Sequence, residues 1–525
     1  MSETAYHRLE TRMRRIGLVG EAAAVLHWDW SAIMPVGGAD ARSEQLAELK
    51  AISHGLLTDA ETGELIEAAS EDAGLNDWQR TNLELIRRNW VKASAVPEDL
   101  VVATAKACSE CETVWRTARA EQDFAKVLPS LETAFGLVME SGRAKAERLG
   151  LSLHDALLDD YEPGLRLATI DPVFDDLARW IPGFLDDVLS RQSAGPDPLA
   201  LEGPFPTAIQ KEFGEKLMAA VGFDFEGGRL DESLHPFCGG TPDDVRITTR
   251  YDEGDFTSAL MGVLHETGHA LYEAGLPKDW RRQPVGHSLG MSIHESQSLL
   301  IEMQVCRSRD FFEYAAPIMR DAFDGEGEAW APENLCRLGT RVERGFIRVE
   351  ADEVTYPAHV ILRHRLERAL VTGDLTLADL PAAFDDAMED TLAIRPPDAA
   401  LGVLQDIHWY AGVFGYFPTY TLGALTAAQF FETATQADPA ITPGIRTGDF
   451  QPLIGWLREN IHARGCRPTN WSKRSPARPS IPRCSRGICG SGIWVVPGRT
   501  KRAPHTNLPY IARQLVSRYS VSGPE

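Results

Sequence analysis

The sequence predicts a mostly α-helical (all-α) protein with one very small β-sheet. Residues 6–225 place apolar side chains at helical spacing, are rich in Ala, Leu, Glu and Arg, and contain few β-branched runs. The same pattern returns at Phe256 and continues to about Asn460. Between these two regions, residues 245–251 alternate in polarity as a strand does.

The first helical region contains five clearly periodic segments. We expect helices at residues 43–57, 77–93, 101–118, 131–149 and 172–189. Cys108 and Cys111 form a CxxC pair within the third of these, but one pair of cysteines cannot complete a tetrahedral zinc site. We therefore interpret the two cysteines as packing residues of a helix.

A non-helical stretch separates the two helical regions. Residues 235–240 (His-Pro-Phe-Cys-Gly-Gly) are typical of a turn, and residues 245–251 (Val-Arg-Ile-Thr-Thr-Arg-Tyr) are typical of a strand. A short strand can bind an extended peptide by adding it as a further strand. This strand is therefore a candidate binding surface beside the helix that follows it.

Composition and charge exclude several classes of protein. The net charge of -23 argues against nucleic acid and against an anionic membrane surface as partners. The segment from Met1 to His7 lacks the apolar core of a signal peptide, and no apolar run approaches the length of a membrane span. Eight scattered cysteines do not form a disulfide framework, so we expect a cytoplasmic, reduced protein.

A metal-binding motif lies in the helix that begins near Phe256. His265 and His269 are four residues apart, so both imidazoles lie on one face of the helix and can bind one metal ion. Glu266 lies one residue further round, where it can hold a water molecule as a general base. Two histidines, a carboxylate base and a third ligand from elsewhere are what metal-assisted peptide hydrolysis requires.

The third ligand is expected in the next apolar helix. Glu295 is the first candidate, although Ser292 and Glu295 would also fit a capping box at the start of that helix. Glu302 lies seven residues later, on nearly the same helical face, and is the second candidate. Spacing favours Glu295 and leaves Glu302 open.

Several stretches, taken together and in this order, resemble the thermostable carboxypeptidase Taq family of metallocarboxypeptidases, peptidase family M32. They are residues 28–30, 34–35, 235–237, 244–248, 265–269, 294–297, 347–352 and 402–409. The resemblance runs from about residue 6 to residue 466, and we take residues 1–466 as the catalytic domain and residues 467–525 as an atypical tail. It implies a two-lobed helical fold with a deep substrate groove and a divalent metal, zinc or cobalt. It also implies release of C-terminal residues from peptides, a homodimer, and Glu295 as the third metal ligand.

A carboxypeptidase must recognise the free α-carboxylate of its substrate. A guanidinium group suits this task because it is always charged and binds a carboxylate through two hydrogen bonds. Arg348 stands at the position that the resemblance implies for this role. Arg246 and Arg250 on the predicted strand are further candidates. The alternative for Arg348 is a surface ion pair with Glu350 or Asp352.

Peptide hydrolysis also needs hydrogen-bond donors for the oxyanion that develops on the scissile carbonyl. His408 is followed by Tyr416 and Tyr420 in a run rich in Gly, Tyr and Phe. This spacing is similar to that of the donors in neurolysin-like zinc peptidases. We predict that His408 and Tyr420 are donors and that Tyr416 binds substrate, with packing of the tyrosines as the alternative.

The sequence therefore predicts a metallocarboxypeptidase that acts on peptides with a free C-terminus. A dipeptidase or an oligoendopeptidase of the related helical-groove group would use the same chemistry. A catalytically impaired peptide-binding protein is the alternative from a different functional class.

Composition changes abruptly after Cys466. Residues 467–525 contain 11 lysines or arginines, eight prolines and one acidic residue, and the family resemblance ends at the same point. The codons permitted for Asn470 onward also allow a shifted frame that encodes an amphipathic segment similar to a family C-terminus. We therefore predict a frameshifted ending, with a genuine basic, disordered tail as the alternative.

Overall fold

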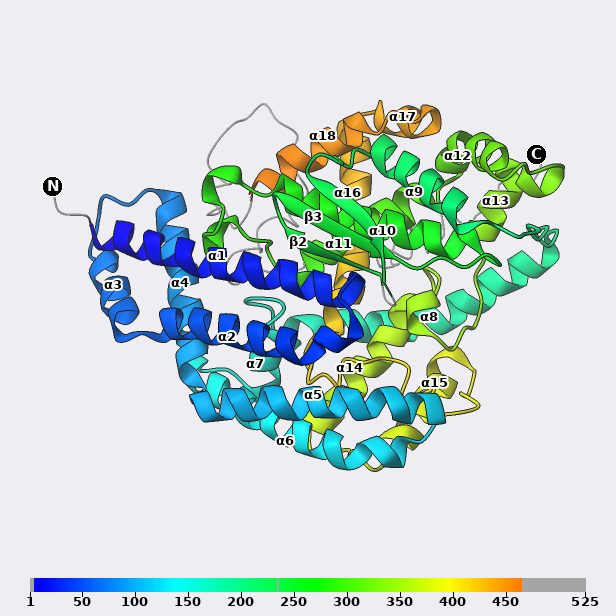
Figure 1. Cartoon of the computed structure of the whole chain (residues 1–525). Coiled ribbons are helices and arrows are strands. Elements are labelled where there is room, and N and C mark those ends of the chain that lie inside the picture. Colours follow the sequence, from blue (N-terminus) through cyan, green and yellow to red (C-terminus); the bar gives the residue numbers. More distant parts are fainter. Residues whose placement is uncertain (1–3, 234–235, 465–525) are drawn as a thin grey trace, which may run out of the picture.

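The computed structural model describes residues 4–233 and 236–464, and its fold is mostly helical (Figure 1). Within the described residues, the α-helices that precede the sheet are α1 Ala5–Ala32, α2 Ala39–Thr58, α3 Ala60–Ser70, α4 Asp77–Ala95, α5 Glu98–Glu121, α6 Phe124–Leu149, α7 Leu153–Leu158, α8 Leu167–Ala194 and α9 Thr207–Val221. The helices after it are α10 Phe256–Gly275, α11 Met291–Leu299, α12 Arg309–Ala322, α13 Pro332–Gly339, α14 Tyr356–Thr372, α15 Leu380–Leu392, α16 Pro418–Ala437, α17 Ile441–Thr447 and α18 Gln451–Asn460. A π-helix, η4 Leu300–Cys306, continues α11 directly.

The five helices expected from periodicity in the first region are all present as α2, α4, α5, α6 and α8. Local signals set several of their ends. Asn76 and Gln79 form a capping box at the start of α4, and Gly150 ends α6 in the left-handed conformation at φ 66°. Cys108 and Cys111 lie on α5 as free thiols, and burial raises the pKa of Cys111 to about 11. This environment agrees with a packing role.

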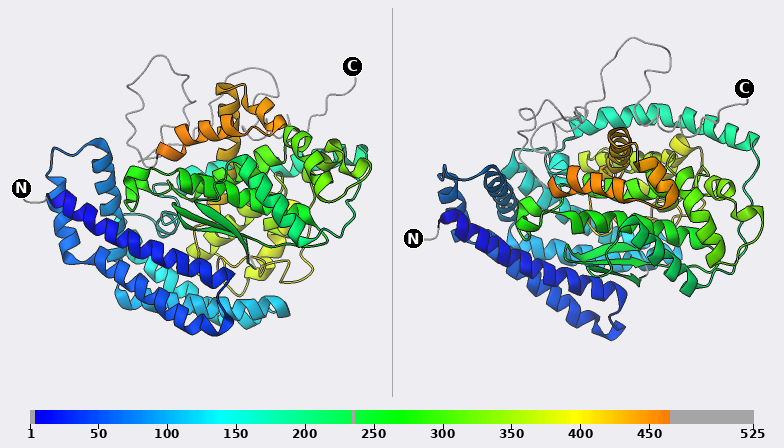
Figure 2. Two further views of the ribbon diagram at one scale, coloured as in Figure 1. Left: turned by 45° about the horizontal axis from the view of Figure 1, so that its top comes forward. Right: turned by 90° about the horizontal axis from the view of Figure 1, so that it is seen from above.

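The helices form two hydrophobic clusters. The smaller cluster joins α1, α3 and α4 through Tyr6, Leu9, Ile66 and Ile86. The larger cluster extends from α5 to α18 and includes most of the helices around α10 and α16. Figure 2 shows α1 and α2 as a long antiparallel pair along one side of the molecule, next to the sheet.

The sheet contains three strands in the order β1-β3-β2: β1 Gly228–Glu232, β2 Phe237–Thr241 and β3 Asp244–Thr249. β1 pairs with β3 in parallel, and β2 pairs with β3 in antiparallel orientation. Val245 and Ile247 on β3 are buried in a third cluster with residues of α10, so the sheet packs directly against the motif helix. The strand predicted at residues 245–251 is confirmed, although the observed strand β3 spans Asp244–Thr249.

The prediction of a turn at residues 235–240 is wrong for the part that the structure describes, because Phe237 to Thr241 form β2. Gly240 explains the difference. It adopts φ +82°, and a Cβ atom there would lie 2.1 Å from the carbonyl oxygen of Asp244. Gly240 therefore allows β2 to lie close to β3 within the sheet and does not mark a loop outside it. His235 lies outside the described residues.

The helical pattern expected from Phe256 to about Asn460 is present as separate helices with irregular stretches between them. Among these stretches, residues 340–355 and 393–417 are long and largely irregular, apart from the short 3₁₀ turn Arg348–Glu350. Glycines at positive φ, including Gly412 and Gly415, stand in the second segment. These two segments carry several of the predicted site residues.

Two predictions concern features at the limits of this description. In residues 4–233 and 236–464, no helix is both long enough and apolar enough to cross a membrane. The predicted change of character after Cys466 lies outside the described residues.

Candidate active site

The two motif histidines lie one turn apart on α10, with ring centroids 5.0 Å from each other. Each ring is oriented through its Nδ1 atom. Nδ1 of His265 lies 2.9 Å from Oε2 of Glu302, and Nδ1 of His269 lies 3.1 Å from the carbonyl oxygen of His294. The Nε2 atoms of both rings therefore remain available to bind a metal ion. In known metal sites, residues behind the ligands orient the histidines in the same way, by contacting the other ring nitrogen.

Glu295 on α11 joins the two histidines in a group of three side chains whose possible metal-ligand atoms lie close together. Its Oε2 lies 3.4 Å from Nε2 of His269 and 3.8 Å from Nε2 of His265. Ligand atoms around a tetrahedral zinc ion are separated by roughly 3.3 Å, as its bond lengths imply. The donor atoms of these three residues all lie within 4.8 Å of one another, and together they could hold a metal ion.

Glu295 does not form the capping box that its spacing with Ser292 allowed. Gly290 is the N-cap of α11, and the backbone N–H of Ser292 donates to Glu162. The Glu295 carboxylate instead accepts hydrogen bonds from Oγ of Ser298 at 3.1 Å and from the hydroxyl of Tyr356 at 3.3 Å. These contacts hold the side chain toward the histidines.

Two glycines allow the helices to come close enough for this geometry. A Cβ atom at Gly268 of α10 would lie 2.4 Å from the carbonyl oxygen of Gln297 on α11. A Cβ atom at Gly423 of α16 would lie 2.7 Å from Cγ of Glu295. Glu295 is therefore held between α10 and α16, because neither helix has a side chain at the point of contact.

Glu302 lies behind His265 rather than beside the three donors. Its Oε2 contacts Nδ1 of His265, and its Oε1 accepts a hydrogen bond from Arg307 at 2.7 Å. Burial would raise the pKa of Glu302, but Arg307 and His265 lower it to about 2. The geometry thus places Glu295 beside the Nε2 atoms of both histidines and Glu302 beside Nδ1 of His265.

The electrostatics of the cluster suit a cation. Glu266 is buried, and burial together with Glu295 and Glu302 raises its pKa to about 7 despite the nearby His265. Burial would lower the pKa of His265, but the same carboxylates raise it to about 10. Three glutamates thus surround two imidazoles, and this donor set fits a divalent metal ion, whose charge would balance the carboxylates.

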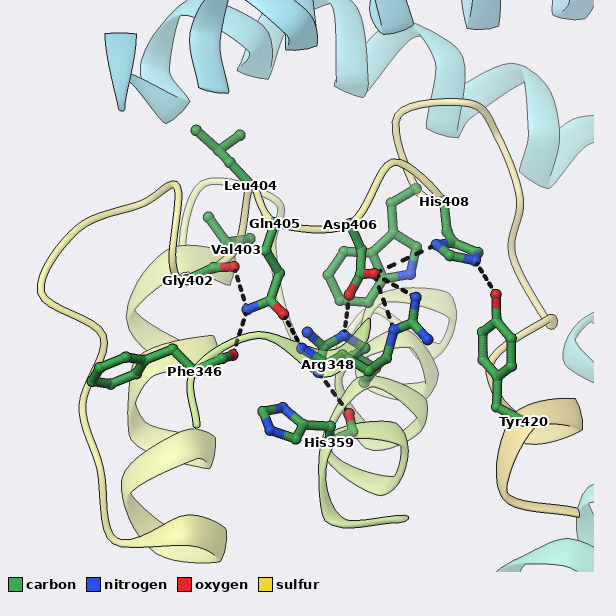
Figure 3. Close-up of polar contacts among 12 residues, drawn as sticks. Phe346, Arg348, His359, Gly402, Val403, Leu404, Gln405, Asp406, His408 and Tyr420 are labelled. Carbon is green, nitrogen blue, oxygen red and sulfur yellow. Dashed lines mark hydrogen bonds and ion pairs between the residues drawn. The ribbon is translucent and has the colours of Figure 1, made fainter. Parts of the chain in front are cut away.

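Arg348 is buried and forms an ion pair with a carboxylate that is far away in the sequence. Its Nε and NH2 atoms donate to Oδ1 of Asp406 at 3.0 and 2.8 Å, as Figure 3 shows. Arg363 of α14 donates to the other oxygen of Asp406 at 2.6 Å. The alternative of a surface pair between Arg348 and Glu350 or Asp352 is therefore wrong.

Two guanidinium groups sharing one carboxylate leave one positive charge in excess. Burial would raise the pKa of Asp406, but Arg348 and Arg363 hold it far below its usual range, so Asp406 stays ionised. The Arg348 guanidinium also lies over the ring of Tyr420, 4.5 Å from its centroid. A buried positive charge next to Tyr420 can attract an anionic group of a substrate.

His408 and Tyr420 face each other (Figure 3). Nε2 of His408 lies 3.0 Å from the Tyr420 hydroxyl. Burial lowers the pKa of His408 to about 3, although Asp406 opposes this shift, and burial raises the pKa of Tyr420 to about 12. Both groups are therefore neutral near pH 7. Tyr420 lies one turn before Gly423 on α16, which places it on the helix face that contacts Glu295.

The profile of the carboxypeptidase Taq (M32) metallopeptidases matches residues 8–473. The chain belongs to this M32 family. It is therefore a metallocarboxypeptidase, which is a hydrolase of peptide bonds, and the predicted family is confirmed.

Individual relatives cover nearly the whole M32 chain. It is 40% identical to thermostable carboxypeptidase 1 of Thermus thermophilus over 476 residues, which are 89% of this chain and 93% of the relative. Carboxypeptidase 1 of Bacillus subtilis is 34% identical over 459 residues, 87% of this chain and 91% of its own. Metallocarboxypeptidase 1 of Trypanosoma cruzi has a similar structure, with a TM-score of 0.85, 38% identity and coverage of 88% and 93%. The predicted fold class is thereby confirmed.

The remaining predicted residues of this M32 enzyme lie in two places. Tyr416 packs edge to face against Tyr420, with ring centroids 5.1 Å apart, beside His408. Arg246 on β3 binds Asp244 through two hydrogen bonds, and its guanidinium lies 4.4 Å from the ring centroid of Trp28 on α1. Arg250 is exposed just after β3. The structure thus joins Tyr416 to the His408 group and ties Arg246 to the side of α1.

Sequence reasoning missed three residues that support the site: Tyr356, Arg363 and Asp406. Asp406 had a signal, because it lies two residues before His408 in the quoted stretch 402–409. The same stretch contains Gln405, which accepts from the backbone N–H of Arg348 and donates to the carbonyl oxygen of Phe346 (Figure 3). Tyr356 and Arg363 lie on an ordinary helical pattern, which does not distinguish them from packing residues.

Proposed function

We propose that this M32 metallocarboxypeptidase binds its metal through His265, His269 and Glu295 and uses Glu266 as general base. The observation that carries this proposal is the convergence of the three donor atoms beside the buried Glu266 carboxylate. Two histidines and one carboxylate are the ligand set of several catalytic zinc sites, so zinc is the proposed metal, with cobalt as an alternative.

Each residue has a distinct task in the proposed reaction. The metal, when bound, supplies a Lewis acid that polarises the scissile carbonyl and acidifies water. Glu266 accepts a proton from the attacking water and returns it to the leaving amine, a role that suits a buried carboxylate beside the metal ligands. His408 and Tyr420 donate hydrogen bonds to the oxygen of the scissile carbonyl as negative charge develops there.

Arg348 is proposed to bind the C-terminal carboxylate of the substrate. Its pairing with Asp406 orients the guanidinium. Arg363 adds a second positive charge, so the cluster of Arg348, Asp406 and Arg363 carries a net positive charge. Arg348, Tyr420 and Tyr416 lie next to one another, so carboxylate recognition and oxyanion stabilisation would adjoin. Arg246 and Arg250 are the second candidates for substrate binding.

Digestion of a matched pair of peptides tests this function. We expect stepwise loss of C-terminal residues from a peptide with a free carboxylate, and little cleavage of the same peptide with a C-terminal amide. A chelator should abolish the cleavage, and added zinc should restore it. Mass analysis of the products distinguishes this outcome from internal cleavage or release of dipeptides, either of which would contradict the proposal.

Metal analysis of two glutamate variants tests the ligand assignment. Glu295→Ala should lose stoichiometric metal because it removes a ligand. Glu302→Gln should still bind metal at saturation, with affinity weakened by about 10–100-fold, because it disturbs only the orientation of His265. Equilibrium dialysis of both variants against zinc, followed by elemental analysis, provides the measurement. A normal zinc content in Glu295→Ala together with no bound zinc in Glu302→Gln would instead identify Glu302 as the third metal ligand.

Three further expectations stay predictions: homodimer formation, a cytoplasmic location and the absence of a nucleic-acid or membrane partner. Light scattering of the purified enzyme measures the first directly.

A further inference from the structure

Glu367 on α14 is a buried carboxylate to which the reaction proposed above assigns no task. Its side chain is 0% exposed. Oε1 accepts a hydrogen bond from the backbone N–H of Gly415 at 2.6 Å, and Oε2 accepts one from the indole N–H of Trp409 at 3.1 Å. His154 of α7 places its Nε2 atom 3.3 Å from Oε1. A carboxylate removed from water is costly unless such donors satisfy its oxygens.

The two donors stand at the ends of one short segment. Trp409 directly follows His408, and Gly415 directly precedes Tyr416. Glu367 thus holds both ends of residues 408–416, the part of the irregular segment that presents His408 and Tyr416. In the part of the chain that the structure describes, no arginine or lysine forms an ion pair with Glu367. Its two oxygens accept hydrogen bonds from the two ends of this segment, and the His154 imidazole lies nearby.

The surroundings leave the segment little freedom. Gly415 adopts φ +88°, and a Cβ atom there would lie 2.6 Å from the backbone nitrogen of Leu158 at the end of α7. Trp409 is 4% exposed, and its ring packs edge to face against Phe417. The α7 and α14 helices also contact each other. Glu367 on α14 and the close approach of Gly415 to Leu158 at the end of α7 therefore hold the segment against both helices.

We infer that Glu367 is a positioning residue that sets the place of His408, and through it the hydrogen bond to Tyr420. The inference rests on the role proposed for His408 as an oxyanion donor. Glu367 does not touch the reacting atoms. It acts because the backbone of Trp409 continues directly into His408, so a shift of the indole moves the imidazole. A misplacement of about 1 Å in a catalytic group can lower the rate about 100-fold.

The isosteric variant Glu367→Gln tests this role. An amide of the same shape offers one acceptor oxygen and one NH2 group, so it cannot accept from both Gly415 and Trp409. We expect kcat to fall by about 10–100-fold, with KM changed by no more than about twofold and with normal metal content. An unchanged kcat would overturn the inference.

A double-mutant cycle with His408 separates positioning from a general loss of structure. If Glu367 acts through His408, Glu367→Gln should slow the wild-type enzyme but not the His408→Ala variant. Effects that multiply in the double variant would overturn the inference. If His408→Ala keeps wild-type kcat, the proposed role of His408 fails, and this inference fails with it. If His408→Ala is slow while Glu367→Gln is normal, only this inference fails.

Two other variants keep the test decisive if Glu367→Gln folds poorly. Trp409→Phe removes the indole N–H and keeps an aromatic ring, and it should reproduce the loss of kcat and the epistasis with His408→Ala. Asn334→Asp is the matched control, because it disrupts buried hydrogen bonds from Asn334 to the carbonyl oxygens of Leu199 and Ala329. The control should lower the melting temperature and leave kcat unchanged. Equal losses of kcat in Trp409→Phe and Asn334→Asp would assign the effect to stability and overturn the inference.

Discussion

Replacement of Glu266 by glutamine is expected to lower kcat by about 10²–10⁴-fold, the contribution of a general base. The amide keeps the shape of the side chain but cannot accept a proton from the attacking water. Metal content should stay normal, because the three converging donors belong to His265, His269 and Glu295. Steady-state kinetics on a free-carboxylate peptide, with elemental analysis of the same sample, provide the measurement.

The comparison that makes this result specific is Glu295→Ala, which should lose activity together with its metal. Saturating zinc should therefore not restore Glu266→Gln, whose metal site is intact. Activity comparable to wild type in Glu266→Gln would refute the proposed mechanism. Loss of metal in that variant would show that Glu266 contributes to metal binding instead.

Replacement of Arg348 by alanine is expected to cost about 2–5 kcal/mol in kcat/KM for peptides with a free C-terminus. This corresponds to about 30–5,000-fold, because about 1.4 kcal/mol is a factor of ten. The guanidinium is buried, so a substrate carboxylate paired with it would be shielded from water and would lose its partner in the variant. The variant should also lose its preference for free over amidated peptides, which kinetics on both substrates measure.

Arg246→Ala is the matched control for this prediction, because Arg246 is also held by an aspartate through two hydrogen bonds. It should keep the discrimination between free and amidated peptides. If discrimination survives in Arg348→Ala and disappears in Arg246→Ala, the carboxylate binds at the strand. Arg250→Ala would then establish whether the second strand arginine contributes.

Short-range periodicity accounts for what could be predicted about the metal cluster. His265, Glu266 and His269 lie within five consecutive residues of one helix, so their relative positions follow from helix geometry. The choice between Glu295 and Glu302 did not follow from spacing, because seven residues of regular α-helix return to nearly the same face. In the structure a π-helix begins at Leu300, so regular α-helical spacing does not continue to Glu302. Glu302 contacts Nδ1 of the His265 ring, whereas Glu295 approaches Nε2.

Long-range pairing explains what could not be predicted around Arg348. Sequence neighbours suggested Glu350 or Asp352 as its partner, but the partner is Asp406, 58 residues further along the chain. Asp352 instead accepts backbone N–H bonds from Val354 and Thr355. The irregular segments that bring Arg348 and Asp406 together contain no periodic pattern, so their mutual contacts cannot be derived from local propensity.

By itself, the sequence determined the helical class, the pair of histidines with its base, and membership of the M32 family through motifs read in order. These features depend on helix periodicity or on direct matches of residues. Only the tertiary structure decided that Glu295 faces both histidines, that Asp406 joins Arg348 to Arg363, and that Glu367 holds the segment after His408. Each of these contacts joins elements far apart in the chain, and their geometry depends on how closely helices can pack, as at Gly268 and Gly423.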